Sequence, residues 1–332
     1  MNELQAIVRH LNRAGAGSVL ATLVTVEGSS YRRPGARMLI AEGGVRIGSV
    51  SGGCLEEDLF ERSKRVSATG RAQLVVYDTT AENDLLWGVG LGCHGVVRIL
   101  LEPLPSRPAW AAAIAENLRT GRATELAVVW DGPAGPPGTM LRDAHAGTSL
   151  KAESGVFSET VKPPTPLSIF GAGDDAQPLA RLAQDLGWSV TVADPRPAMP
   201  TAARFPGVSG LVAGPADELA ARVAPAPGSL AIVMTHHYVH DRPLLRHLLP
   251  LPLAYLGLLG PRARAQRILA DIAEEGLAVT PAMRLRLRAP VGLDLGADGP
   301  QEVALSVIAE MKAVLAGRDG RPLRDRTLPI HA

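Results

Sequence analysis

The residue best suited to chemistry in this sequence is Cys54, which follows the turn-forming residues Ser51, Gly52 and Gly53. Glycines let a backbone approach a ligand closely and adopt positive φ values. Residues 55–66 have helical apolar spacing with acids in the first turn, so Cys54 is predicted at a helix start. Backbone N–H groups there favour a thiolate, the form that binds metals. The spacing alone fits a small buried cysteine at a tight turn equally well.

Two further loops in the first half of the chain carry residues suited to binding. Residues 28–37 combine glycines with Arg32, Arg33 and Arg37, a composition that suits a phosphate group. Cys93 lies in a second glycine-rich loop, where we expect it to support a contact rather than make the primary one. We expect these two loops and the cysteine turn to converge on one pocket.

Composition limits the class of protein. A length of 332 residues predicts two domains, and a net charge of +1 with 4% aromatic residues argues against nucleic-acid binding. Two cysteines cannot build a disulfide framework for a chain of this size. The first residues predict an amphipathic helix without an apolar signal core, and no run approaches the roughly 20 apolar residues of a membrane span. We therefore expect a cytoplasmic protein.

The chain is predicted to be α/β with two domains, divided at the proline-rich segment 163–166. The first, residues 1–162, mixes strands and helices as an α+β domain; residues 38–41 and 45–50 read as two of its short strands. The second, residues 163–332, has the alternation of a Rossmann-like domain with a mostly parallel sheet.

The second half opens with a strand, a glycine turn containing Gly171 and Gly173, a helix, and a strand that ends at Asp194. A Rossmann unit places the carboxylate that binds a ribose hydroxyl about 20 residues after its glycines. This pattern predicts NAD or, because of Arg196, NADP as a possible ligand. A Rossmann-like scaffold that holds another phosphorylated ligand or no nucleotide is the alternative.

Another candidate site follows the strand at residues 230–234. His236, His237, His240 and Asp241 lie at its carboxyl end, where ligands bind in open α/β sheets. His236 and His240 could contribute to a metal site. Histidines packed at a strand–helix turn fit the same pattern.

Seven motifs together resemble the xanthine dehydrogenase accessory protein family of the XdhC/CoxI type. They are GSSYRRPGARM (28–38), GSVSGGCLEEDL (48–59), GLGCHG (90–95), FGAGDDAQPLARLAQDLGWSVTVADPRP (170–197), THH with HD (235–241), GLLGPRARAQRIL (257–269) and APVGLDLGADGPQEVALSVIAEM (289–311). The resemblance covers both halves, and the SGGC turn is its most specific part.

That resemblance implies a cofactor chaperone rather than an enzyme. Such a protein binds the molybdenum cofactor while a cysteine desulfurase installs a sulfido ligand. It then inserts the cofactor into an apo molybdenum hydroxylase of the xanthine dehydrogenase or aldehyde oxidase class. Cys54 is the implied cofactor contact and possible molybdenum ligand, because soft sulfur suits this metal. The family also implies a homodimer.

Two other functions compete with this one. An NAD(P)-dependent oxidoreductase would use the Rossmann domain, with the histidine cluster supplying an acid or base. A metal-dependent hydrolase would use the same histidines as ligands. The cysteine turn favours the chaperone over the oxidoreductase, since a dehydrogenase does not require it and the first half lacks an obvious catalytic acid–base set.

Overall fold

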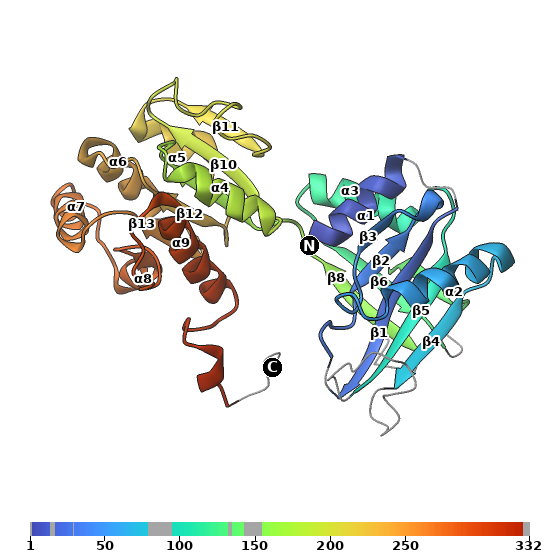
Figure 1. Cartoon of the computed structure of the whole chain (residues 1–332). Coiled ribbons are helices and arrows are strands. Elements are labelled where there is room, and N and C mark those ends of the chain that lie inside the picture. The colour runs from blue at the N-terminus through green and yellow to red at the C-terminus, as the bar shows by residue number, and fades with distance from the viewer. Residues whose placement is uncertain are drawn as a thin grey trace. The chain divides into compact units, whose positions relative to one another are not determined.

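The computed structural model describes residues 2–13, 17–28, 30–78, 95–131, 135–142 and 155–327. Contacts divide the chain into two compact units, Met1–Pro163 and Pro164–Ala332 (Figure 1). Across the described ranges, every helix is too short or too polar to cross a membrane.

The first unit is built on a five-stranded antiparallel sheet in the order β3-β2-β1-β5-β4. Its elements are α1 (Asn2–Arg13), β1 (Val19–Gly28), β2 (Arg37–Ile40), η1 (Glu42–Gly44), β3 (Arg46–Gly48), α2 (Glu56–Thr69), β4 (Gln73–Asp78) and β5 (Gly95–Pro103). Strand β1 is rich in β-branched and aliphatic residues, and its first six are buried. Leu59 and Val66 of α2 pack into the core on one face of this sheet.

A three-stranded antiparallel sheet, in the order β7-β6-β8, completes the first unit. Its elements are α3 (Ala109–Arg119), β6 (Thr124–Val129), β7 (Gly138–Leu141) and β8 (Val156–Val161). Buried Glu102 of β5 accepts a hydrogen bond from the Thr139 backbone N–H of β7 at 2.7 Å. Val24, Leu100 and Val128 form a small core shared by the two sheets. The sheets are therefore joined by both polar and apolar contacts.

The second unit has a six-stranded parallel sheet in the order β11-β10-β9-β12-β13-β14, which is the strand order of a Rossmann fold. Its elements are β9 (Pro166–Phe170), α4 (Ala176–Asp185), β10 (Ser189–Asp194), β11 (Gly210–Ala213), α5 (Ala216–Val223), β12 (Leu230–Val233), α6 (Tyr238–Leu248), β13 (Tyr255–Leu258), α7 (Arg262–Glu274), α8 (Pro281–Arg286), β14 (Leu287–Arg288), α9 (Pro300–Leu315) and η3 (Leu323–Asp325). The predicted α/β class and Rossmann-like second half are confirmed.

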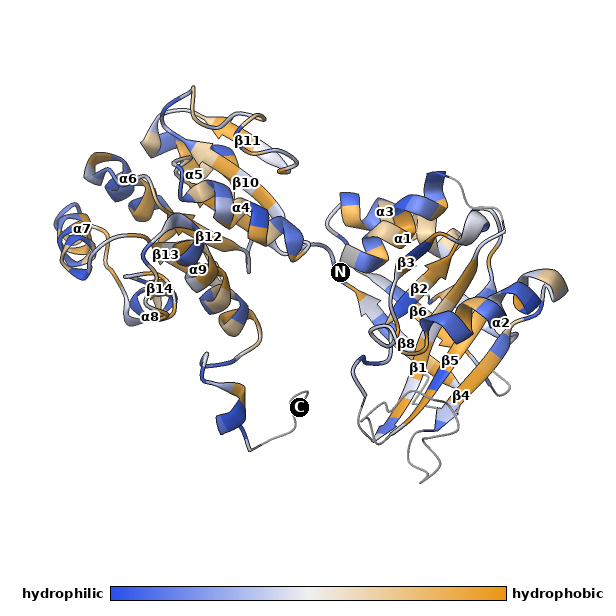
Figure 2. Cartoon of the chain, in the orientation of Figure 1, coloured by the Kyte–Doolittle hydropathy of each residue, from blue (hydrophilic) through white to orange (hydrophobic). Residues whose placement is uncertain are grey.

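Helices cover both faces of this parallel sheet. Helices α4 and α9 pack into one apolar core, and α5, α6 and α7 pack into another. Leu230 and Ile232 of β12 face the first core, whereas Ala231 and Val233 face the second. Figure 2 shows the resulting concentration of apolar residues in the strands. A strand buried on both sides is continuously apolar, which is why β12 reads LAIV.

Candidate functional site

The turn between β3 and α2 is organised by the side chain of Glu56, the first residue of the helix. Oε1 accepts from Ser49 Oγ at 2.8 Å, Val50 N at 3.0 Å and Ser51 N at 2.9 Å. Oε2 accepts from Gly53 N at 2.9 Å, from Leu55 N at 3.2 Å and from the Ser51 hydroxyl. One carboxylate therefore ties together the segment that contains Cys54.

These contacts set the ionisation of Glu56. Burial raises its pKa, but hydrogen bonds from Ser51, Ser49 and Val50 outweigh that effect and lower the pKa to about 2. The carboxylate is therefore charged at any physiological pH. Sequence reasoning placed this acid in the first helical turn but did not predict its role. The available signal was an acid at the start of the helix that follows the Ser/Gly turn, where backbone N–H groups attract a carboxylate.

Cys54 is a free, exposed thiol on this turn. The N–H groups of Gly53 and Leu55, on either side of it, both donate to Glu56. The expectation that unpaired N–H groups face the thiol is therefore wrong for these two, because the neighbouring carboxylate takes them. Gly53 has φ +120°, and among the described residues no heavy atom lies within 4 Å of the position a Cβ would occupy. The turn thus carries an exposed sulfur next to a glycine in a left-handed conformation.

The three predicted phosphate-binding arginines have different environments. Arg32 forms a two-point ion pair with Glu3 of α1, including an Nη1–Oε1 contact of 3.1 Å. Arg37 is 3% exposed and pairs with Glu159 of β8. Arg33 is exposed, and its guanidinium makes no ion pair or hydrogen bond with the described residues. Of these three arginines, only Arg33 has a guanidinium free to bind an anion in this conformation.

The strand registers give the levels in the sheet at which the strands flanking the predicted loops end. Gly28, which ends β1, pairs with Gly95, which begins β5. Asp78 ends β4 opposite the start of β5, and Gly48 ends β3 opposite the start of β2. Gly28, Gly95 and Asp78 therefore lie at one end of the sheet, whereas Gly48 pairs with Met38, which faces Ala21 of β1, seven residues before Gly28. The arginine loop and the cysteine turn leave the sheet at different levels and approach each other through Tyr31 and Gly52. Cys93 itself lies outside the described residues.

The glycine turn of the second unit is held by its own chain. Gly171 has φ +126°, and a Cβ there would lie 2.4 Å from the Met234 carbonyl oxygen, so only glycine fits. Asp194 is fully buried, and its Oδ2 accepts from Ala172 N at 2.6 Å. Arg196 donates to both oxygens of Asp194 at 2.8 Å. The carboxylate predicted to bind a ribose is thus occupied by the turn and by Arg196.

Burial raises the pKa of Asp194, but hydrogen bonds from the Arg196 side chain and from Ala172 N lower it overall. Gly173 differs from Gly171, because no atom of the described residues lies within 4 Å of its would-be Cβ. Asp174 beside it pairs with Arg204 at 2.9 Å, and Arg204 also donates to the Ala172 carbonyl oxygen. This bracing by Arg204 was not predicted from the sequence.

The predicted histidine cluster is divided among separate contacts. His236 Nε2 lies 2.9 Å from Asp175 Oδ2, and the His237 and His240 rings meet edge to face at 5.7 Å. Asp241 is fully buried, accepts from Thr235 Oγ1 at 2.5 Å and pairs with Arg264. In the ranges that the structure describes, no three His, Cys, Asp or Glu side chains are grouped to hold a metal ion. This geometry does not favour the hydrolase.

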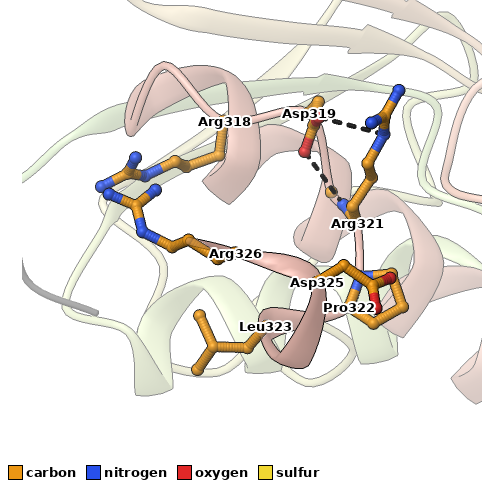
Figure 3. A pocket seen from close by; sticks show the side chains of 8 residues that line it. Arg318, Asp319, Arg321, Pro322, Leu323, Asp325 and Arg326 are labelled. Atoms are coloured by element: carbon orange, nitrogen blue, oxygen red, sulfur yellow. Dashed lines mark hydrogen bonds and ion pairs between the residues drawn. The ribbon is translucent and has the colours of Figure 1, made fainter. Parts of the chain in front are cut away.

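A pocket in the second unit follows α9 (Figure 3). Arg318, Leu323 and Arg326 line it, and Asp319 pairs with Arg321 at its rim, 3.2 Å apart. It contains no residue that the sequence predicted for a site. The candidate site therefore remains the cysteine turn.

Comparisons with known proteins agree with the motifs. Residues 11–78 match the model of the XdhC and CoxI family, and residues 167–311 match that of the XdhC Rossmann domain. A Bacillus subtilis (strain 168) protein described as a probable subunit of xanthine dehydrogenase is 36% identical over 312 residues, covering 89% of this chain and 92% of the relative.

The Escherichia coli (strain K12) molybdenum cofactor insertion chaperone PaoD is 26% identical over 301 residues, covering 91% of this chain and 84% of that protein. A crystal structure from Bacillus halodurans, described as a xanthine dehydrogenase, superposes with a TM-score of 0.81 at 28% identity and covers 98% of both chains. The chain belongs to the XdhC and CoxI family, with the XdhC Rossmann domain in its second unit.

Proposed function

We propose that this protein binds the molybdenum cofactor and inserts it into an apo molybdenum hydroxylase of the xanthine dehydrogenase or aldehyde oxidase class. The observation that carries the proposal is the exposed Cys54 thiol on a turn fixed by Glu56. The similarity to a molybdenum cofactor insertion chaperone supports the same function.

The residues of the turn fit such a cargo. A thiolate is a soft ligand suited to molybdenum, and Cys54 is exposed, so a bulky group can reach it. The cofactor carries a phosphate, which the exposed guanidinium of Arg33 can bind with charge-assisted hydrogen bonds. Arg32 and Arg37 contribute indirectly, since their ion pairs hold the loop that presents Arg33.

Protein-bound cofactor would also be available for modification before delivery. We propose that a cysteine desulfurase installs the terminal sulfido ligand while the cofactor is held at Cys54. An exposed turn suits this sequence of events, because both the desulfurase and the client enzyme must reach the same molybdenum atom.

The Rossmann unit gives less support to the oxidoreductase alternative. Asp194 is buried and accepts four hydrogen bonds from its own chain, so no free carboxylate oxygen is left for a ribose diol. A phosphorylated nucleotide would have to use the outward part of Arg196 instead. The proposed function therefore does not depend on NAD(P) binding.

The test is anaerobic binding of the molybdenum cofactor to wild-type protein and to Cys54→Ala. We expect wild-type binding to weaken at least about tenfold in the variant, a loss of about 1.4 kcal/mol or more, with unchanged thermal unfolding. Equal affinity in both proteins would place the site away from Cys54. Absence of binding to wild-type protein would refute the proposed function.

A further inference from the structure

Tyr31 differs from the other tyrosines of this chain. It is 72% exposed, and its hydroxyl makes no hydrogen bond with any described residue. The other three each donate to a carboxylate: Tyr77 to Asp58, Tyr238 to Asp271 and Tyr255 to Glu310. Tyr31, in the loop between β1 and β2, is thus the tyrosine whose ring and hydroxyl are accessible to a ligand.

The position of Tyr31 is defined by the cysteine turn. A Cβ on Gly52 would lie 2.9 Å from Cε1 and 3.0 Å from Cδ1 of the Tyr31 ring. Gly52 also has φ +94°, a conformation that favours glycine. One edge of the ring therefore lies against a backbone that Glu56 holds in place through the N–H groups of Ser51 and Gly53.

Two exposed functional groups lie within two residues of this contact. Arg33 follows Tyr31 by two positions, which separates their Cα atoms by no more than about 7.5 Å. Cys54 follows Gly52 by the same spacing. An exposed aromatic ring, a cation and a thiol thus lie on residues within two positions of the contact between Tyr31 and Gly52. These three chemistries match the pterin, the phosphate and the molybdenum centre of the cofactor.

We propose that Tyr31 binds the pterin ring of the molybdenum cofactor by stacking. Flat heteroaromatic rings stack on exposed aromatic side chains, and removing such a platform typically weakens binding about tenfold or more per ring. The inference rests on the proposed function and adds a residue that recognises the organic part of the cofactor. It also gives Gly52 a specific role, since any side chain there would displace the platform.

The test uses full-length protein and a phosphorylated pterin that carries neither metal nor dithiolene, titrated by quenching of pterin fluorescence. We expect Tyr31→Ala to weaken binding of this probe at least about tenfold, and Tyr31→Phe to bind within about twofold of wild type. Val45→Ala, which removes another exposed apolar side chain of the same unit, should leave the affinity unchanged.

The intact cofactor, titrated in parallel, separates this inference from the proposed function. Cofactor binding that depends on Cys54 but is unchanged by Tyr31→Ala would overturn the stacking role and leave the chaperone function standing. Failure of wild-type protein to bind the intact cofactor would refute the proposed function and this inference with it.

Discussion

The most informative single substitution is Glu56→Gln, because it keeps the shape of the side chain and removes its charge. The glutamine would retain one acceptor oxygen. Its NH₂ group would replace the other oxygen and would face N–H and O–H donors that it cannot accept from. Depending on its orientation, the backbone N–H groups of either Ser51 or Gly53 would lose their acceptor. We therefore expect the turn that carries Cys54 to loosen and the first unit to lose stability.

The pKa of Glu56 gives the size of this effect. The difference between its ordinary value of 4.5 and about 2 corresponds to about 3.4 kcal/mol at 1.36 kcal/mol per pKa unit. Glu56 is partly exposed, and solvent screening reduces the expected loss to about 2 kcal/mol. For a unit of this size, that loss lowers the unfolding temperature by about 4–8 °C.

The assay is urea unfolding followed by tryptophan fluorescence, which reports mainly on the first unit because Trp87, Trp110 and Trp130 lie there. The matched control is Glu57→Gln, which removes one solvent-exposed ion pair with Arg46 and should lower the stability much less than Glu56→Gln does. Equal stability of the two variants would refute the role assigned to Glu56.

Four further outcomes follow from the contacts. The difference in free energy of unfolding between wild type and Glu56→Gln should be fully present above pH 4.5 and should disappear as the pH falls through about 2, because only the ionised carboxylate stabilises the folded state. Unfolding curves across that pH range measure this difference. Gly171→Ala should lower the free energy of unfolding by at least about 3 kcal/mol, whereas Gly173→Ala should lower it by less than about 1 kcal/mol, both measured by thermal unfolding. Arg37→Met should lower the free energy of unfolding in urea by about 3 kcal/mol, because the Glu159 carboxylate loses its partner. Arg33→Met should change it by no more than about 0.5 kcal/mol. Asp194→Asn should cost about 2–3 kcal/mol by the same measurement, because buried donors lose a charged acceptor.

Much of the second unit was predictable because its signals are local. The strand β9, the turn at Gly171 and the helix α4 follow one another within about one βαβ unit, and each has its own sequence pattern. The roles of the polar residues were less predictable. Asp194 matched the position of a ribose-binding acid, but its contacts with Ala172 N and Arg196 can be seen only in three dimensions.

The first unit shows the same limit more strongly. The strand expected at residues 45–50 ends at Gly48, because the following residues turn to surround Glu56. The three-stranded sheet was not predicted, since β7 and β8 are short and pair only through β6. Arg37 finds its partner Glu159 across 122 positions of the sequence, a distance over which residue spacing carries no information.

Delivery of the molybdenum cofactor by this protein to a client enzyme can be measured as transfer between the two proteins. The most direct measurement loads the purified protein anaerobically with cofactor, adds an apo molybdenum hydroxylase, and follows molybdenum content and activity of the recovered enzyme. We predict near-stoichiometric transfer that is faster than with free cofactor and is lost with Cys54→Ala. Activation of the client enzyme by free cofactor at the same rate, with no dependence on this protein, would contradict the proposed delivery function.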